Sequence, residues 1–220
     1  MISQYKDHLE SKENYEQLFL YEIQKNYKDN WGLMKKPLED MIDSSIQSQL
    51  TRRLWRGKNF EPKEMMMAFA KMNPDFVSQM FRDLHNQSKA IDGRIDRFMF
   101  YCDELLRDFK NKNAAKVDNN HFHDHWMLSI YLALEYPADY AIYDKVLFHK
   151  MLTYVKAKNI SEAPDTERYF KVTKLILGFM QKEEGLIEIH QKRLNPDIHY
   201  TGLSGMMVYE MAEHFFSNPK

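Results

Sequence analysis

The stretch "IDGRIDRFMFYCDELLRDFK", residues 91–110, decides the fold class. Its large apolar residues alternate at spacings of four and three, at Ile91, Ile95, Phe98, Cys102, Leu105 and Phe109. This spacing places them on one face of an α-helix. The charged residues of the stretch fall off that face, at Asp92, Arg94, Asp96, Asp103, Arg107 and Asp108. We therefore predict a long amphipathic helix whose apolar face is buried.

The same periodicity predicts helices along most of the chain. They are expected over residues 5–27, 37–46, 63–72, 74–84, 127–134, 147–155, 167–180 and 203–216. Residues 127–134 are apolar on nearly all sides, which is typical of a fully buried helix. With only 7 Gly and 7 Pro in 220 residues, the chain lacks the turns of an all-β protein. The expected fold is all-α or mostly α, an irregular multi-helix bundle with one short extended segment near residues 140–143.

Composition limits the class of protein. Residues 1–220 are expected to form a single helical domain, with the polar segment 110–120 as the best candidate for a sub-boundary. The net charge of −1 gives no global basic field that would attract nucleic acid. The single cysteine excludes a disulfide framework, and no apolar run approaches the ~18 residues of a membrane span. We predict a cytoplasmic protein without membrane contact.

The chain lacks the sequence signatures of common catalytic sites. It contains neither G-x-x-x-x-G-K-[ST] nor G-x-G-x-x-G for nucleotides, and no G-x-S-x-G for a hydrolase. Cys102 falls on the apolar face of its helix, which is typical of an inert packing thiol. We expect no catalysis in this chain and no cofactor.

Three histidines alternate at His121, His123 and His125. On a strand all three would share a face and could bind a metal, whereas on a helix only His121 and His125 would. The residues that follow are strongly helical, so the motif is predicted to be the polar first turn of a buried helix. No metal site is expected, and a small metalloenzyme using His121 and His125 is the disfavoured alternative.

One segment concentrates basic residues around an aromatic ring, at Arg52, Arg53, Trp55, Arg56 and Lys58. Cations beside an aromatic side chain suit phosphate contacts combined with base stacking. The alternative is that Trp55 anchors the segment to the core while the cations are simply solvated. These five residues are the predicted nucleic-acid contact.

Two longer stretches resemble a known family. "WRGKNFEPKEMMMAFAKMNPDFVSQMFRDLHNQSKAIDGRIDRF", residues 55–98, and "SIYLALEYPADYAIYDKVLFHKML", residues 129–152, resemble the N-terminal helical region of McrB-like AAA+ ATPases and GTPases. With the closing "VYEMAEHFF", the likeness spans residues 55–216. Those proteins belong to modification-dependent restriction and defence systems, in which the N-terminal region is accessory and faces the target. The resemblance carries over no catalytic residue, because the AAA+ module is absent here, and it favours a fragment of a longer protein.

Two functions follow from these patterns. The first is a non-catalytic recognition or adaptor domain of a McrB-like protein, which contacts DNA through the basic segment. The alternative is a protein-interaction module that docks to an AAA+ motor or to a partner nuclease subunit without touching nucleic acid. The run Met65, Met66, Met67 would then be an exposed, adaptable contact surface.

Overall fold

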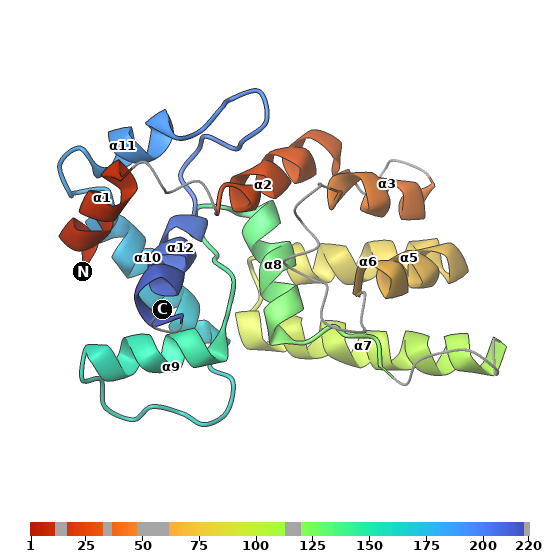
Figure 1. The fold of residues 1–220 in the computed structure, drawn as a ribbon. Helices are drawn as coiled ribbons and strands as arrows, with labels where there is room; N and C mark the ends of the chain where they lie inside the picture. The colour runs from red at the N-terminus through yellow and green to blue at the C-terminus, as the bar shows by residue number, and fades with distance from the viewer. Residues whose placement is uncertain (12–16, 33–36, 48–61, 113–119, 218–220) are drawn as a thin grey trace. The chain divides into compact units, whose positions relative to one another are not determined.

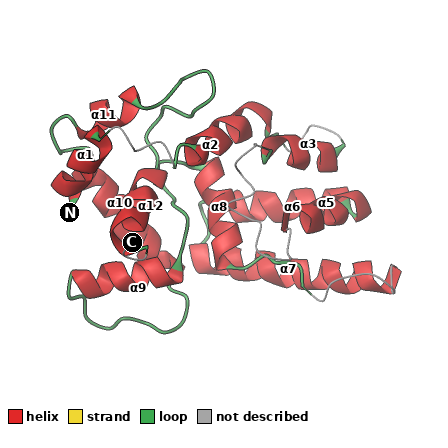
Figure 2. Cartoon of the chain, in the orientation of Figure 1, coloured by secondary structure: helices red, strands yellow, loops and turns green. Residues whose placement is uncertain are grey.

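The computed structural model describes residues 1–11, 17–32, 37–47, 62–112 and 120–217 (Figure 1). Within these ranges the chain forms 11 helices and no strand (Figure 2). The prediction of an all-helical fold is therefore confirmed. Residues 140–143, where a short extended segment was expected, lie outside the helices and are not part of a strand. No helix in the described ranges is both long and apolar enough to cross a membrane.

The chain divides into two compact units. The first contains residues 1–25 and 129–220, and the second contains residues 26–128. The divisions fall inside helices α2 (Phe19–Asn30) and α8 (His125–Glu135). The polar segment 110–120, which the sequence marked as a sub-boundary, is not where this division lies. Each unit is described by itself below.

Between the end of α2 and the start of α8, the described residues of the second unit form four helices. They are α3 (Leu38–Ser45), α5 (Pro62–Met72), α6 (Pro74–His85) and α7 (Ile91–Lys112). Helix α5 packs against α3, α6 and α7, and α6 also packs against α7 (Figure 1). The side chain of Asn73 caps α6 by accepting a hydrogen bond from the Phe76 N–H, at 3.3 Å. The rings of Phe81 and Phe98, 5.2 Å apart, join α6 to α7 in the core.

Helix α7 follows the predicted pattern with one correction. Its seam is buried at Ile95, Phe98, Cys102 and Leu105. Arg94, which was expected on the solvent side, is also buried, and its Nη1 donates to the Leu84 carbonyl at 2.8 Å. An arginine can bury its aliphatic stem while its head satisfies a carbonyl in the last turn of a neighbouring helix. Arg94 therefore fixes the C-terminal end of α6 on α7.

The part of the first unit that the structure describes contains five further helices. They are α1 (Ile2–Glu10), α9 (Lys145–Tyr154), α10 (Thr166–Met180), α11 (Leu186–Lys192) and α12 (Met206–Phe216). Helix α12 packs against α1, α9 and α10, and every residue from Met206 to Ala212 is buried. The predicted single helix over residues 5–27 is wrong. Helix α1 ends at Glu10, where Ser11 is extended, and α2 begins only at Phe19.

Helix α8 and the segment after it confirm the prediction of a buried helix. Residues 127–134 are all buried, and the helix ends two residues before Pro137. The N–H of Gly205 donates to the Pro137 carbonyl at 2.7 Å. A Cβ on residue 205 would lie 2.4 Å from the Tyr140 carbonyl oxygen, so only glycine permits this close approach. The segment after α8 therefore packs directly against the backbone at the start of α12.

Candidate functional site

The predicted nucleic-acid contact cannot be placed on the fold. Arg52, Arg53, Trp55, Arg56 and Lys58 lie outside the described residues. Their role stays a prediction from the sequence. The described part of the chain brings together other groups, two of them buried polar clusters and one an exposed apolar face.

The second unit contains a cluster of three potential metal ligands, Cys102, His121 and His123, called here the Cys-His cluster. Cys102 comes from α7, and the two histidines come from the loop before α8. One ligand atom of each residue lies within 4.8 Å of the others. The three residues are 0%, 9% and 2% exposed, respectively. The cluster is therefore closed off from bulk solvent.

This arrangement corrects the expectation for the histidines. Helix α8 begins at His125, so residues 120–124 are not helical and helical geometry does not separate His121 from His123. The motif was expected to place His121 and His125 one turn apart on a helix. Instead His121 and His123 converge on α7, while His125 becomes the first residue of α8. Cys102 occupies a buried position, as predicted, yet it has the two imidazoles beside it.

The loop that carries the histidines has an unusual backbone. Phe122 has φ of 60°, in the left-handed region that bulky residues rarely adopt. The Asn120 side chain accepts from the Phe122 N–H at 2.7 Å, and the His123 N–H donates to His121 Nδ1 at 3.0 Å. This tight turn holds the two imidazole rings with their centroids 5.7 Å apart.

Hydrogen bonds fix the orientation of both rings. Because His121 Nδ1 accepts from a backbone N–H, its Nε2 carries the proton and donates to Asp103 Oδ1 at 3.1 Å. His123 Nδ1 lies 2.6 Å from the His121 carbonyl oxygen, so that nitrogen is the donor and Nε2 carries the lone pair. A carboxylate or carbonyl on the outer nitrogen is the usual support of a metal-bound histidine.

Burial determines the protonation of the cluster. Burial, with a further contribution from the neighbouring His121, lowers the pKa of His123 to about 3. Burial also raises the pKa of the Cys102 thiol, with a smaller contribution from Asp103. At neutral pH the His123 imidazole and the Cys102 thiol are therefore both neutral.

The first unit contains a second buried polar cluster, Arg193, Glu210 and Tyr21, called here the ion-pair cluster. Arg193 Nη2 donates to Glu210 Oε1 at 2.6 Å, and the Tyr21 hydroxyl donates to Glu210 Oε2 at 2.9 Å. Burial alone would lower the pKa of Arg193, but the Glu210 carboxylate together with Tyr21 and Tyr5 outweighs burial and raises that pKa. The His190 ring packs edge-on against Tyr21 with centroids 4.8 Å apart. This cluster contains both its own cation and its own anion.

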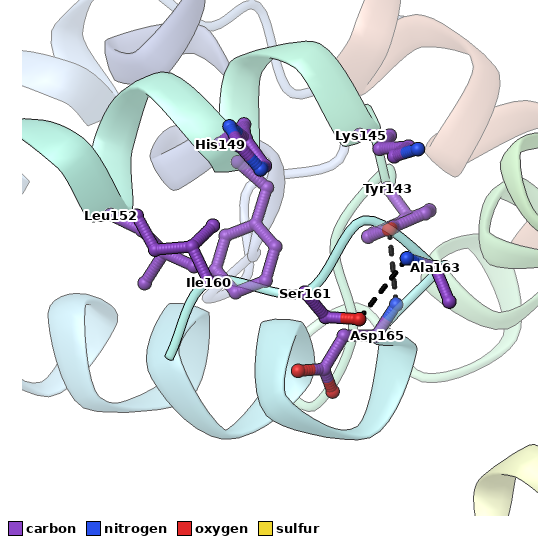
Figure 3. A pocket seen from close by; sticks show the side chains of 9 residues that line it. Tyr143, Lys145, His149, Leu152, Ile160, Ser161, Ala163 and Asp165 are labelled. Carbon is purple, nitrogen blue, oxygen red and sulfur yellow. Dashed lines mark hydrogen bonds between the residues drawn. The ribbon is translucent and has the colours of Figure 1, made fainter. Parts of the chain in front are cut away.

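A shallow depression also lies in the first unit, between α9 and the loop that leads to α10 (Figure 3). The enclosed space between its side chains is only about 10 Å³, far below the roughly 300–1,000 Å³ of typical ligand pockets. The Tyr143 hydroxyl accepts from the Asp165 N–H at 3.2 Å, and Ser161 Oγ accepts from the Ala163 N–H at 3.1 Å (Figure 3). These hydroxyls hold the loop rather than form a reactive centre.

Helix α10 exposes an apolar face, made of Val172, Leu175, Ile176 and Phe179 and called here the α10 stripe. Leu175 is 60% exposed and Phe179 is 52% exposed, while Val172 and Ile176 are partly exposed. The adjacent face, which includes Tyr169, Phe170, Thr173, Leu177 and Met180, is buried. The helix is therefore apolar on two sides, of which only one is covered in the described chain.

The methionine run does not form the expected exposed surface. Met66 is fully buried in α5, and Met65 and Met67 are only partly exposed. The helix places Met66 on the same buried face as Phe69 and Ala70. The interaction surface predicted from Met65, Met66 and Met67 is therefore wrong for Met66. The α10 stripe offers a larger apolar surface.

Comparison with protein-family models, with curated proteins and with solved structures finds no match to this chain. The resemblance to McrB-like proteins therefore stays a prediction from the residues quoted for it.

Proposed function

We propose that this chain is a non-catalytic adaptor module that docks to a protein partner through the α10 stripe. The partner suggested by the sequence resemblance is the AAA+ motor of a McrB-like restriction or defence system. The proposal includes a cytoplasmic location, for which the single cysteine is the support.

The observation that carries this proposal is the spacing of the stripe. Val172, Leu175, Ile176 and Phe179 stand at positions i, i+3, i+4 and i+7 of α10. This is the pattern by which an amphipathic helix inserts into an apolar groove of a partner. Scattered exposed apolar residues are ordinary, but four in one row along a helix mark an interaction site. Lys182 lies 6.0 Å from the Phe179 ring and would border the contact with a positive charge.

Light scattering after gel filtration tests the proposal, with the chain alone and mixed with the purified AAA+ module of a McrB-like protein. We expect the mixture to form a complex, and the double variant Leu175→Asp/Phe179→Asp to lose it. Val146→Asp is the matched control, because Val146 is 62% exposed on α9 and equally apolar. A chain that stays separate from the motor, or a double variant that binds like Val146→Asp, contradicts the proposal.

DNA binding is the second candidate, and the basic segment Arg52, Arg53, Trp55, Arg56 and Lys58 supports it. Phosphate contacts by such cations make affinity fall steeply as salt rises. A fluorescence titration with plain and methylated duplex at low and high salt tests this role. Replacing the three arginines by glutamine should abolish binding, whereas the α10 double variant should bind as the wild type does. No binding at low salt would exclude the candidate.

A further inference from the structure

The Cys-His cluster has the composition of a zinc site. Zn²⁺ is bound in proteins by cysteine sulfur at about 2.3 Å and histidine nitrogen at about 2.0–2.1 Å, in tetrahedral geometry. Ligand atoms around one such ion lie roughly 3.3–3.8 Å from one another. In this chain the three ligand atoms already lie within 4.8 Å of one another. A movement of about 1 Å would therefore place them at three corners of the coordination tetrahedron.

Ordinary packing explains this cluster less well. A buried cysteine on the apolar face of a helix requires no polar neighbour, and a single buried histidine is common in a core. Here two histidines are turned toward the same thiol by a left-handed Phe122, and each has an outer hydrogen-bond acceptor. Asp103 Oδ1 supports His121, and the His121 carbonyl supports His123. Such outer acceptors orient metal-bound imidazoles.

We propose that Cys102, His121 and His123 bind one Zn²⁺ ion, with water as the fourth ligand. A thiolate with two imidazoles selects zinc over magnesium or calcium, which prefer oxygen ligands. On binding, the Cys102 thiol releases its proton to solvent and the sulfur forms a bond to the metal. His121 Nδ1 gives up the hydrogen bond that it accepts from the His123 N–H, so that its lone pair becomes available to the metal. The hydrogen bond from His121 Nε2 to Asp103 stays. The ion ties α7 to the loop that leads into α8, all within the second unit. This inference is independent of the proposed adaptor role.

Cobalt titration tests the proposal on the 220-residue chain, purified without a histidine tag and stripped of metal by a chelator. We expect one equivalent of Co²⁺ to bind with a thiolate-to-cobalt charge-transfer absorption, which added Zn²⁺ removes. Cys102→Ser should lose this absorption and bind at least about 100-fold more weakly. His125→Gln, which alters the neighbouring histidine of the same motif, should titrate as the wild type does.

A further variant separates an orienting role from general damage to the fold. Asp103→Asn should keep the charge-transfer absorption while weakening affinity by about 10- to 100-fold, because the metal ligands are intact. The wild-type titration decides the matter even if Cys102→Ser does not fold, and His123→Gln serves as the second ligand variant. No stoichiometric Co²⁺ in the wild type, or an absorption that persists in Cys102→Ser, would overturn the assignment.

Discussion

The two buried polar clusters differ in what they contain. The ion-pair cluster holds Arg193 against Glu210 at 2.6 Å, so its charges compensate each other. The Cys-His cluster holds a thiol and two imidazoles, of which the Cys102 thiol and the His123 imidazole are neutral at pH 7. Both clusters are buried, but one is an ion pair and the other is a group of metal-binding side-chain types. In the first cluster the charge of Arg193 is balanced by Glu210, whereas the second gathers three side chains of the kinds that bind a metal cation.

The largest effect is expected from breaking the ion-pair cluster. Glu210→Gln leaves the Arg193 charge buried without its counter-ion, and we expect a loss of about 3–5 kcal/mol in the free energy of unfolding. Urea unfolding followed by circular dichroism measures it. The double variant Arg193→Met/Glu210→Gln removes the stranded charge and should recover at least half of that loss. A single variant as stable as the wild type would show that the pair contributes little.

A smaller effect concerns pH and the histidine beside the ion-pair cluster. Burial, with a further contribution from Arg193, lowers the pKa of His190 to about 3 in the folded protein, against about 6.5 in an unfolded chain. Below pH 6.5 the unfolded chain therefore takes up a proton that the folded chain does not, and stability falls as the pH falls toward 3. From pH 7.5 to pH 5.5, His190 should account for a loss of about 1.4 kcal/mol.

His190→Phe removes this titration while keeping an aromatic ring against Tyr21. Between pH 7.5 and 5.5, the unfolding free energy of this variant should fall by about 1.4 kcal/mol less than that of the wild type. The other histidines titrate in both proteins and cancel in the difference. Equal losses in the two proteins would mean that His190 is not held neutral by its surroundings.

The smallest effect compares two helix caps, one in each unit. Asp124 Oδ1 accepts from the Met127 N–H at 3.0 Å at the start of α8, and Asp165 Oδ1 accepts from the Arg168 N–H at 3.2 Å at the start of α10. Replacing either by alanine should cost about 1 kcal/mol. Only Asp124→Ala should also weaken Co²⁺ binding, because Asp124 follows His123 directly. Thermal unfolding and cobalt titration of both variants check this, and equal metal affinities would contradict it.

The fold class was predictable because periodicity survives in helices with one buried face. Helices α5, α6, α7 and α8 fall close to the expected ranges. The helix over residues 5–27 was wrong, because apolar spacing continued beyond Glu10 although the backbone there leaves the helix. On α10 the spacing of Val172, Leu175, Ile176 and Phe179 identified a helix but not which of its two apolar faces is covered.

The candidate sites were less predictable, since they depend on contacts between distant residues. The histidine motif at residues 121–125 was predicted to be helical because the apolar pattern of α8 follows it directly. Phe122 instead adopts a left-handed backbone conformation, so the helix does not extend to His121. Cys102 lies far from His121 in sequence, and only the packing of the loop against α7 joins them. In the same way, Arg193, which directly follows α11, meets Glu210 of α12 only through the packing of the folded chain. Single-sequence patterns carry no signal for such pairs.

X-ray absorption at the zinc edge tests most directly the claim that the Cys-His cluster lacks only a cation. On protein loaded with one equivalent of Zn²⁺, we predict one sulfur at about 2.3 Å and two imidazole nitrogens at about 2.0–2.1 Å around the metal. The remaining ligand should be an oxygen from water. A shell of nitrogen and oxygen alone, with no sulfur, would contradict the account, as would protein that retains no zinc after buffer exchange.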